Sequence, residues 1–284
     1  MIRKFLPVLF WALTLQQRPL LAQDRVRADS LFSVSLSRTM HLSVLLPSGY
    51  EGQKKYPLLF LLHGWGGNER NWLDFTSLAS DPVSDSLIIV MPQADNSWYV
   101  NSMAVRSERY EDYLIGDLER FVRSRYSVDT ARESIAGLSM GGYGALVLGL
   151  RHPDRFHFIG VLSGSLDVPG RIDEMEKLGR GILVPSLRRA FGASRTPLWD
   201  DDDPFKLIGR ITRDSLPYIY LVTGIQEPYT GRLLLYRAFA DSLRIRNDPY
   251  EYHETPGVHD FRFWGREIRP LLKRLQETNR KQSY

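Results

Sequence analysis

Residues 137–144 constrain the fold of this chain more than any other segment. They read Gly-Leu-Ser-Met-Gly-Gly-Tyr-Gly, follow a short apolar run at Ser134–Leu138 and precede a helix-forming segment at Gly141–Leu150. A serine on a tight turn between a strand and a helix projects its hydroxyl outward, and glycines on either side avoid a steric clash. The helix that follows offers free backbone N–H groups to negative charge. Ser139 is therefore the candidate nucleophile.

The rest of the chain alternates between apolar runs and helical patterns. Continuous apolar runs suit strands that are buried on both faces, and apolar residues at helical spacing predict the helices between them. Strands are predicted at 57–62, 87–91, 134–138, 158–162, 218–222 and 250–254, an antiparallel edge pair at 32–36 and 40–46, and helices at 110–126, 141–150, 233–243 and 261–275. This alternation predicts an α/β fold with a mainly parallel, twisted sheet covered by helices on both faces. We expect a single catalytic domain at 23–284.

One long stretch breaks the alternation. Residues 167–214 separate two predicted strands and contain glycine, proline and the acidic run Asp200–Asp203. A connection of this length is unusual in a compact domain unless it is functional or solvated. The sequence leaves two interpretations open, a cap or substrate-binding insertion and a solvated connecting region.

Composition excludes several classes of function. The 37 basic and 33 acidic residues give a net charge of +4, and they are interspersed along nearly the whole chain, so a nucleic-acid partner is not expected. There is no cysteine, which excludes disulfides, thiolate metal ligands and a cysteine nucleophile.

The first 22 residues have the pattern of a signal peptide. Arg3 and Lys4 precede an apolar run at Phe5–Leu15, and Ala22 is a suitable cleavage site. The run is too short to span a bilayer, which needs about 20 apolar residues. We therefore expect a periplasmic or secreted protein without stable membrane insertion after cleavage; a buried N-terminal strand is the alternative.

A serine nucleophile needs a base, and His259 is the best of the six histidines. When a nucleophile occupies this type of turn, the acid and the histidine follow it on loops after later strands. This order disfavours His41 and His63, and two other histidines, His152 and His157, flank the helix after the turn too closely. His253 lies inside a predicted strand, whereas His259 lies on a loop before the final helix.

The third member should be a carboxylate after the strand at 218–222. Glu227 is the first one there, and a glutamate can hold the imidazole in one tautomer as well as an aspartate can. Asp241 and Asp260 are the fallback candidates.

Backbone N–H groups are expected to stabilise the negative charge that develops on the substrate carbonyl. The loop His63-Gly64-Trp65-Gly66-Gly67 follows a predicted buried strand and can provide one donor at Trp65, while Met140 provides the other. His63 itself is interpreted as a structural hydrogen-bonding residue.

Taken together, these segments resemble the esterase D family of α/β-hydrolases, which includes tributyrin, feruloyl and acetylxylan esterases, S-formylglutathione hydrolases and mycolyltransferases. The resemblance extends from about Ser33 onward. It rests on Leu-Leu-His-Gly at 61–64, Met91-Pro92, Ser97-Trp98-Tyr99, the motif at 137–144, His152-Pro153-Asp154 with Phe156, Leu162-Ser163-Gly164, and Pro256–Phe261 with Trp264.

The resemblance implies an α/β-hydrolase fold, with Trp98 and Tyr99 near the mouth of the substrate pocket and residues 167–214 shaping it. The sequence departs from the family at the acid, because the usual aspartate of a Gly-x-x-Asp-Pro pattern is Glu227 here.

The expected activity is that of a serine carboxylesterase acting on acetyl, butyryl or feruloyl-type esters, either small molecules or groups on a polysaccharide. The Ser139–His259–Glu227 mechanism needs neither a metal nor a cofactor. An acyltransferase to a sugar or lipid hydroxyl, and a catalytically idle carbohydrate-binding homologue, are the alternatives. The sequence does not determine the oligomeric state.

Overall fold

A single eight-stranded sheet organises the part of the chain that the computed structural model describes, residues 24–177, 181–228 and 231–281. Its strand order is β1-β2-β4-β3-β5-β6-β7-β8. β1 and β2 pair antiparallel, as do β2 and β4, and every other neighbouring pair is parallel. The strands are β1 (Val26–Ser33), β2 (Arg38–Leu45), β3 (Tyr56–Leu62), β4 (Ile88–Pro92), β5 (Val128–Leu138), β6 (Phe158–Leu162), β7 (Tyr218–Gly224) and β8 (Tyr250–Thr255).

The central strands are apolar throughout because both faces of the sheet are buried. Leu58, Phe60 and Leu62 of β3 belong to one apolar core, whereas Leu59 and Leu61 point into a second core on the opposite face. This explains why their sequence is a continuous apolar run and not an alternating one. The predicted α/β fold with a mainly parallel sheet is confirmed.

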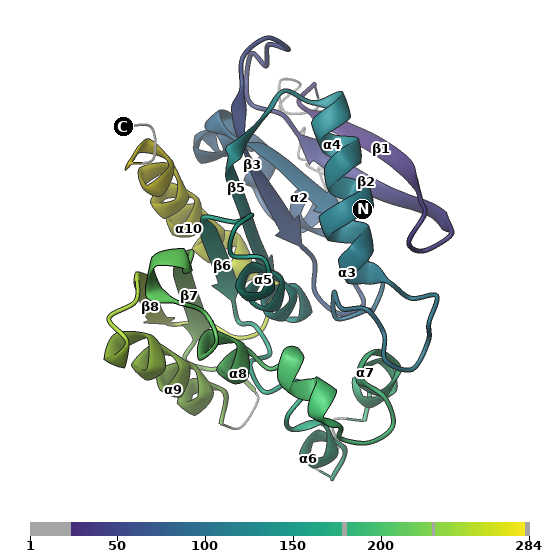
Figure 1. The fold of residues 1–284 in the computed structure, drawn as a ribbon. Coiled ribbons are helices and arrows are strands. Elements are labelled where there is room, and N and C mark those ends of the chain that lie inside the picture. The colour runs from purple at the N-terminus through teal and green to yellow at the C-terminus, as the bar shows by residue number, and fades with distance from the viewer. Residues whose placement is uncertain (1–23, 178–180, 229–230, 282–284) are drawn as a thin grey trace, which may run out of the picture.

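Helices cover both faces of the sheet (Figure 1). One core contains side chains from α5, α9 and the segment α3-η3-α4, and the other contains side chains from α2 and α10. The helices outside the insertion are α2 (Asn71–Phe75), η1 (Leu78–Ser80), η2 (Pro82–Ser86), α3 (Tyr110–Asp112), the π-helical η3 (Tyr113–Leu118), α4 (Glu119–Arg125), α5 (Met140–Arg151), α9 (Arg232–Ile245) and α10 (Phe261–Lys281). The predicted helix at 110–126 therefore has a π-helical middle turn.

The first edge strand differs from its prediction. We expected it at 32–36, but β1 begins at Val26 and ends at Ser33, so the predicted bounds were wrong. Alternation of apolar residues continues into a turn, where Val34 is exposed and Ser37 adopts a positive φ of 52°. The carboxylate of Asp117 accepts hydrogen bonds from the Ser33 hydroxyl and the Ser35 N–H, which holds this turn against η3.

Between β6 and β7, the described residues of the segment 167–214 form a set of short helices, the last of which ends at Ser215. They are α6 (Ile172–Lys177), α7 (Val184–Phe191), η4 (Pro197–Asp201), α8 (Pro204–Ile208) and η5 (Arg213–Ser215). Trp199 of η4 is buried and donates from its indole to the Phe191 carbonyl, while the Tyr143 hydroxyl of α5 donates to the Asp202 carbonyl. These contacts anchor the segment to α5. In Figure 1, α6 and α7 lie together beyond one end of the sheet.

The expected signal peptide at 1–22 lies outside the described residues. Within residues 24–281, apart from the two gaps, no helix combines the length and apolar character that crossing a membrane requires.

Candidate active site

Ser139 lies on a strained turn between β5 and α5. Its φ of 52° and ψ of −116° place it in a region that residues other than glycine rarely adopt. A side chain on Gly141 would meet the carbonyl oxygen of His63 at 2.5 Å, so only glycine lets the start of α5 pack against the end of β3. The turn therefore holds the Ser139 hydroxyl at the carboxyl end of the sheet.

Two neighbouring loops carry the other two members of the predicted triad. Glu227 follows β7, and His259 lies between β8 and α10. The Gln226 N–H donates to the Gly257 carbonyl at 3.1 Å, and the Ile225 N–H donates to the Thr255 carbonyl at 2.9 Å. A side chain on Gly224 would meet the Gly257 oxygen at 2.3 Å, so a glycine there allows the two loops to lie against each other.

These loops bring Ser139, His259 and Glu227 into one hydrogen-bonded line. His259 Nε2 lies 2.9 Å from Ser139 Oγ, and His259 Nδ1 lies 2.8 Å from Glu227 Oε2. The Glu227 side chain is 1% exposed and the His259 side chain 13%. In this geometry the carboxylate accepts from Nδ1–H, and Nε2 accepts the hydrogen bond of the serine hydroxyl.

The electrostatics keep the carboxylate charged and the imidazole neutral. Burial opposes ionisation of Glu227, but the hydrogen bond from His259 and the positive charge of Arg232 together hold its pKa below the usual value. Burial lowers the pKa of His259, and the hydrogen bond to Glu227 offsets this only in part. A neutral imidazole at neutral pH is the form that a general base requires.

Arg232 is a residue of this candidate site that our sequence reasoning missed. It is the first residue of α9 and its side chain is 8% exposed; its Nε lies 3.8 Å from Glu227 Oε2, and its Nη1 donates to the Ser163 carbonyl. A cation at a helix N-terminus opposes the helix dipole. That unfavourable placement is the signal in the sequence that could have drawn attention to it.

The fallback carboxylates have other partners. Asp241 is exposed on α9 and pairs with Arg244. Asp260 Oδ1 accepts from the Phe263 N–H at 2.9 Å, which caps the start of α10 directly after His259. His253 pairs with Glu251 on β8, so neither it nor the two aspartates contact Ser139.

Of the two residues expected to provide the oxyanion donors, Trp65 lines the same cavity as Ser139, and Met140 begins the helix that follows Ser139. Met140 is the first residue of α5, so its N–H has no acceptor within the helix. Trp65 lies on the loop after β3, where the neighbouring Gly66 N–H donates to Asn96 Oδ1 at 2.6 Å and ties the loop to the one after β4.

His63 has a structural environment. It is 1% exposed; its Nδ1 lies 2.7 Å from the Gly64 carbonyl, and its Nε2 accepts from the Ala94 N–H at 3.1 Å. Burial lowers the pKa of His63, so the ring is a neutral donor and acceptor that links the loops after β3 and β4.

A cavity of about 390 Å³ opens above Ser139. Its lining is mainly apolar and aromatic, with a few polar groups near the serine. The lining residues are Gly64–Gly67, Asn71, Phe75, Trp98, Leu138, Ser139, Ser165, Leu183, Arg232, His259, Phe261 and Trp264. Such a cavity can hold a small or aromatic acyl group against the hydroxyl.

The two expected pocket aromatics lie in different places. Both side chains are buried, Trp98 at 1% exposed and Tyr99 at 0%; Trp98 lines the cavity, whereas the Tyr99 hydroxyl donates to the His63 carbonyl at 2.8 Å. The Tyr99 ring lies against Gly144 of α5 and belongs to the core. Of the pair, only Trp98 lines this cavity.

Among the residues described, no group of three or more His, Asp or Glu side chains is arranged to hold a metal ion.

Comparisons with known proteins identify the family of the chain. A family model named Esterase, described as "Putative esterase", matches residues 33–275. An acetyl esterase of Caldicellulosiruptor saccharolyticus is 29% identical over 216 residues, which cover 74% of this chain and 79% of that protein. An endo-1,4-beta-xylanase/feruloyl esterase of Xylanibacter ruminicola is 32% identical over 165 residues, which cover 52% of this chain and 23% of that protein.

The fold is also found among solved structures. FphF, a fluorophosphonate-binding serine hydrolase of Staphylococcus aureus, superimposes with a TM-score of 0.73 at 24% identity, covering 88% of this chain and 97% of that one. The match of the family model over most of the chain confirms the resemblance drawn from the sequence motifs. The chain therefore belongs to this esterase family of α/β-hydrolase proteins, and it is a carboxylic ester hydrolase.

Proposed function

We propose that the protein is a serine esterase in which Ser139 is the nucleophile, His259 the general base and Glu227 the acid of the triad. The observation that carries this proposal is the continuous line of hydrogen bonds from Ser139 Oγ through His259 to Glu227 at the floor of a cavity. A neutral imidazole between a hydroxyl and a buried carboxylate is the arrangement that activates a serine.

The reaction proceeds by two acyl transfers. His259 Nε2 takes the Ser139 proton while Oγ attacks the ester carbonyl, and the backbone N–H groups of Trp65 and Met140 stabilise the resulting oxyanion. Collapse of this intermediate breaks the bond to the alcohol, which leaves with the proton from His259. Water then attacks the acyl-enzyme with His259 again as base, and the acid is released with Ser139 restored.

The cavity supports an acetyl or aryl acyl group of the feruloyl type. Phe75, Phe261 and Trp264 surround the space beside His259, and their rings pack edge to face or at a tilt. Flat aromatic walls suit a planar aryl group as well as a small acyl group. The names of the acetyl esterase and feruloyl esterase relatives agree with this range.

Export to the periplasm or the medium is part of the proposal. It rests on the charge, apolar run and cleavage site within the first 22 residues.

The test is Ser139→Ala with p-nitrophenyl acetate as substrate. We expect kcat to fall by about 10³-fold or more. The nucleophile acts together with the base, and neither His259 nor Glu227 can replace it. Ser124→Ala is the matched control, since Ser124 is an exposed serine on α4 that bonds the Phe121 carbonyl, and it should retain wild-type turnover.

Three outcomes separate the alternatives. Turnover by folded Ser139→Ala at the wild-type rate would remove Ser139 from the mechanism. Failure of a fluorophosphonate probe to label the folded wild-type protein would favour an idle binding protein. Transfer of the acyl group to an added sugar or alcohol in preference to water would identify an acyltransferase.

A further inference from the structure

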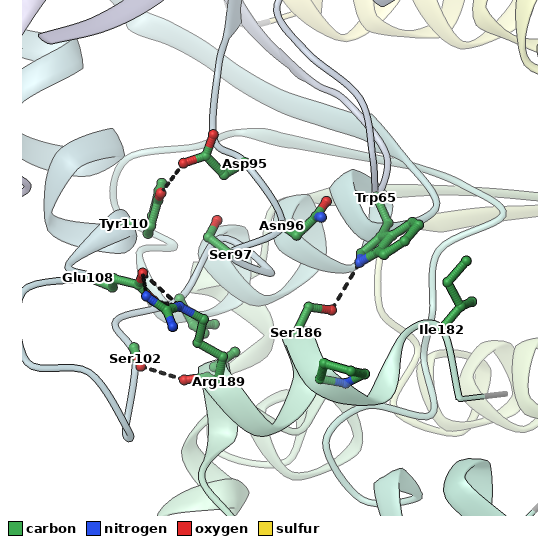
Figure 2. A pocket seen from close by; sticks show the side chains of 13 residues that line it. Trp65, Asp95, Asn96, Ser97, Ser102, Glu108, Tyr110, Ile182, Ser186 and Arg189 are labelled. Atoms are coloured by element: carbon green, nitrogen blue, oxygen red, sulfur yellow. Dashed lines mark hydrogen bonds and ion pairs between the residues drawn. The ribbon is translucent and has the colours of Figure 1, made fainter.

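Arg232 is a buried cation beside the triad, and the mechanism described above does not use it. Its side chain is 8% exposed and lines the cavity above Ser139. Arg189 of α7 provides a contrast, because its side chain is 60% exposed and pairs with Glu108 at 2.6 Å. That pair lies on the wall of a second cavity of about 490 Å³, between α7 and the loop after β4 (Figure 2). Since removing a guanidinium from water costs free energy, the buried position of Arg232 calls for a reason within the site.

The helix that carries Arg232 does not supply this reason. Arg232 begins α9, directly after Gly231, which adopts a positive φ of 82°. The partial positive charge of a helix N-terminus disfavours a cation at this place. The guanidinium instead donates from Nη1 to the Ser163 carbonyl after β6, and its Nε lies 3.8 Å from Glu227 Oε2 after β7. The side chain therefore joins two active-site loops.

The charged and titratable groups around the His259–Glu227 pair come from α9 and from the loop of His259 itself. Arg232 and Tyr236 face the pair from α9, and Asp260 follows His259 before α10. Burial raises the pKa of Tyr236, so its phenol stays neutral. Burial lowers the pKa of His259, the carboxylates of Glu227 and Asp260 raise it, and the charge of Arg232 lowers it. Arg232 thus supplies the positive charge that acts on this pair.

The sign of its effect follows from the proton that the pair takes up. At low pH an added proton gives the pair of neutral His259 and ionised Glu227 one more positive charge. A cation 3.8 Å from the carboxylate opposes that addition, whereas the charge of Glu227 favours it. With Arg232 in place, the imidazole therefore stays neutral, and able to act as a base, down to a lower pH.

We propose that Arg232 is a positioning residue of the triad whose buried charge extends the activity of the esterase to more acidic pH. The inference rests on the proposed function, since it concerns the same His259–Glu227 pair. The guanidinium joins the loop of Glu227 to the loop of Ser163, and its charge keeps His259 unprotonated between turnovers.

The test is Arg232→Gln with p-nitrophenyl acetate, measured as the pH profile of kcat/KM. We expect the acid limb to move to a pH about 0.5–1 higher, because the pair is then protonated more easily. This direction is opposite to the one expected for Glu227→Gln. Arg232→Lys retains the charge, so its acid limb should stay close to that of the wild type even if the altered contacts reduce kcat. A residue that acted only by packing would reduce kcat in both variants and leave the acid limb in place.

Arg237→Gln is the matched control. Arg237 lies on the same helix, its side chain is 55% exposed, and it pairs with Glu254 at 2.7 Å. Its replacement should leave both kcat and the acid limb at their wild-type values. If Arg232→Gln alone does not fold, the double variant Arg232→Gln with Glu227→Gln removes both buried charges and leaves no unpaired carboxylate. His259 should then be protonated at a higher pH than in Glu227→Gln alone.

A second readout does not depend on turnover. In Ser139→Ala protein, proton NMR follows the ring resonance of His259, assigned through its loss in His259→Gln, and its pH midpoint should rise by the same amount when Arg232→Gln is added. If wild-type protein does not hydrolyse p-nitrophenyl acetate, the esterase proposal fails, while this titration still tests Arg232. A midpoint that stays unchanged or falls in Arg232→Gln, or that rises equally in Arg232→Lys, would refute the inference.

Discussion

Glu227 lies in the sequence where the related family usually has an aspartate. Its carboxylate is almost fully buried, and burial alone would favour the protonated form. His259 and Arg232 keep it ionised, so the buried charge is held between a hydrogen-bond donor and a cation. The longer side chain of glutamate reaches His259 Nδ1 at 2.8 Å from the loop after β7.

Glu227→Gln should lower kcat by about 10²–10⁴-fold with little change in KM, because the imidazole loses the charge that stabilises its protonated form. Burial already lowers the pKa of His259, so the wild-type kcat/KM should fall only as pH drops below about 6.5. Glu227 raises that pKa, and its neutral replacement should move the acid limb to still lower pH. The measurement is the pH profile of kcat/KM for p-nitrophenyl acetate.

Glu227→Asp is the matched control for this prediction. It retains the charge, so its acid limb should stay closer to that of the wild type even if the shorter side chain reduces kcat. An acid limb that lies at the same pH in wild type and Glu227→Gln would contradict the assigned role and return attention to Asp260.

Among the structural elements, α7 is joined to the loops around the active site through one hydroxyl. Ser186 accepts from the indoles of Trp65 and Trp98, which lie on the loops after β3 and β4. The Trp65 side chain is therefore fixed by the insertion, while its backbone N–H is the proposed oxyanion donor. The insertion thus helps to position the donor as well as to border both cavities.

Ser186→Ala should reduce kcat for p-nitrophenyl acetate about tenfold and change KM little. Two indole N–H groups lose their acceptor, and a small displacement of the Trp65 backbone weakens a contact that matters most in the transition state. Ser186→Thr retains the hydroxyl and should restore most of kcat. The idea would be wrong if Ser186→Ala raised KM alone, or if the threonine variant were no better than the alanine variant.

The elements themselves could be predicted largely from apolar patterning. β6 was predicted at its observed bounds because both of its faces are buried, and its sequence is therefore four apolar residues and Gly160 without a polar side chain. β1 was misjudged because alternation continues through Val34, which lies in an exposed turn. The positions of Trp98 and Tyr99 could not be predicted, since both adopt positive φ values of 58° and 62° without being glycine.

In the whole molecule, the position of the candidate active site follows from the topology of the sheet. β5, β7 and β8 run parallel, so the loops at their carboxyl ends meet at one edge and bring together residues 139, 227 and 259. The order of these residues along the chain was therefore sufficient to nominate the triad. Ser186 and the second cavity could not be predicted, because they depend on how residues 181–192 fold back over the β3 and β4 loops.

α10 covers the face of the sheet opposite α5 and begins two residues after His259. Leu271 of α10 is fully buried and occupies the space that Gly160 leaves on β6. Leu271→Ala should reduce the free energy of unfolding by about 2–5 kcal/mol, because it removes apolar contacts and leaves a cavity. Lys273→Ala, an exposed position on the same helix, should change it by less than about 0.5 kcal/mol.

Urea titrations monitored by tryptophan fluorescence and by p-nitrophenyl acetate turnover check this prediction together. Because α10 fixes the loop of His259, activity and fluorescence should be lost at the same urea concentration in Leu271→Ala, and that concentration should lie below the wild-type midpoint. An unchanged midpoint would mean that Leu271 contributes little to the core. Activity lost well before fluorescence would mean that the His259 loop unfolds independently of α10.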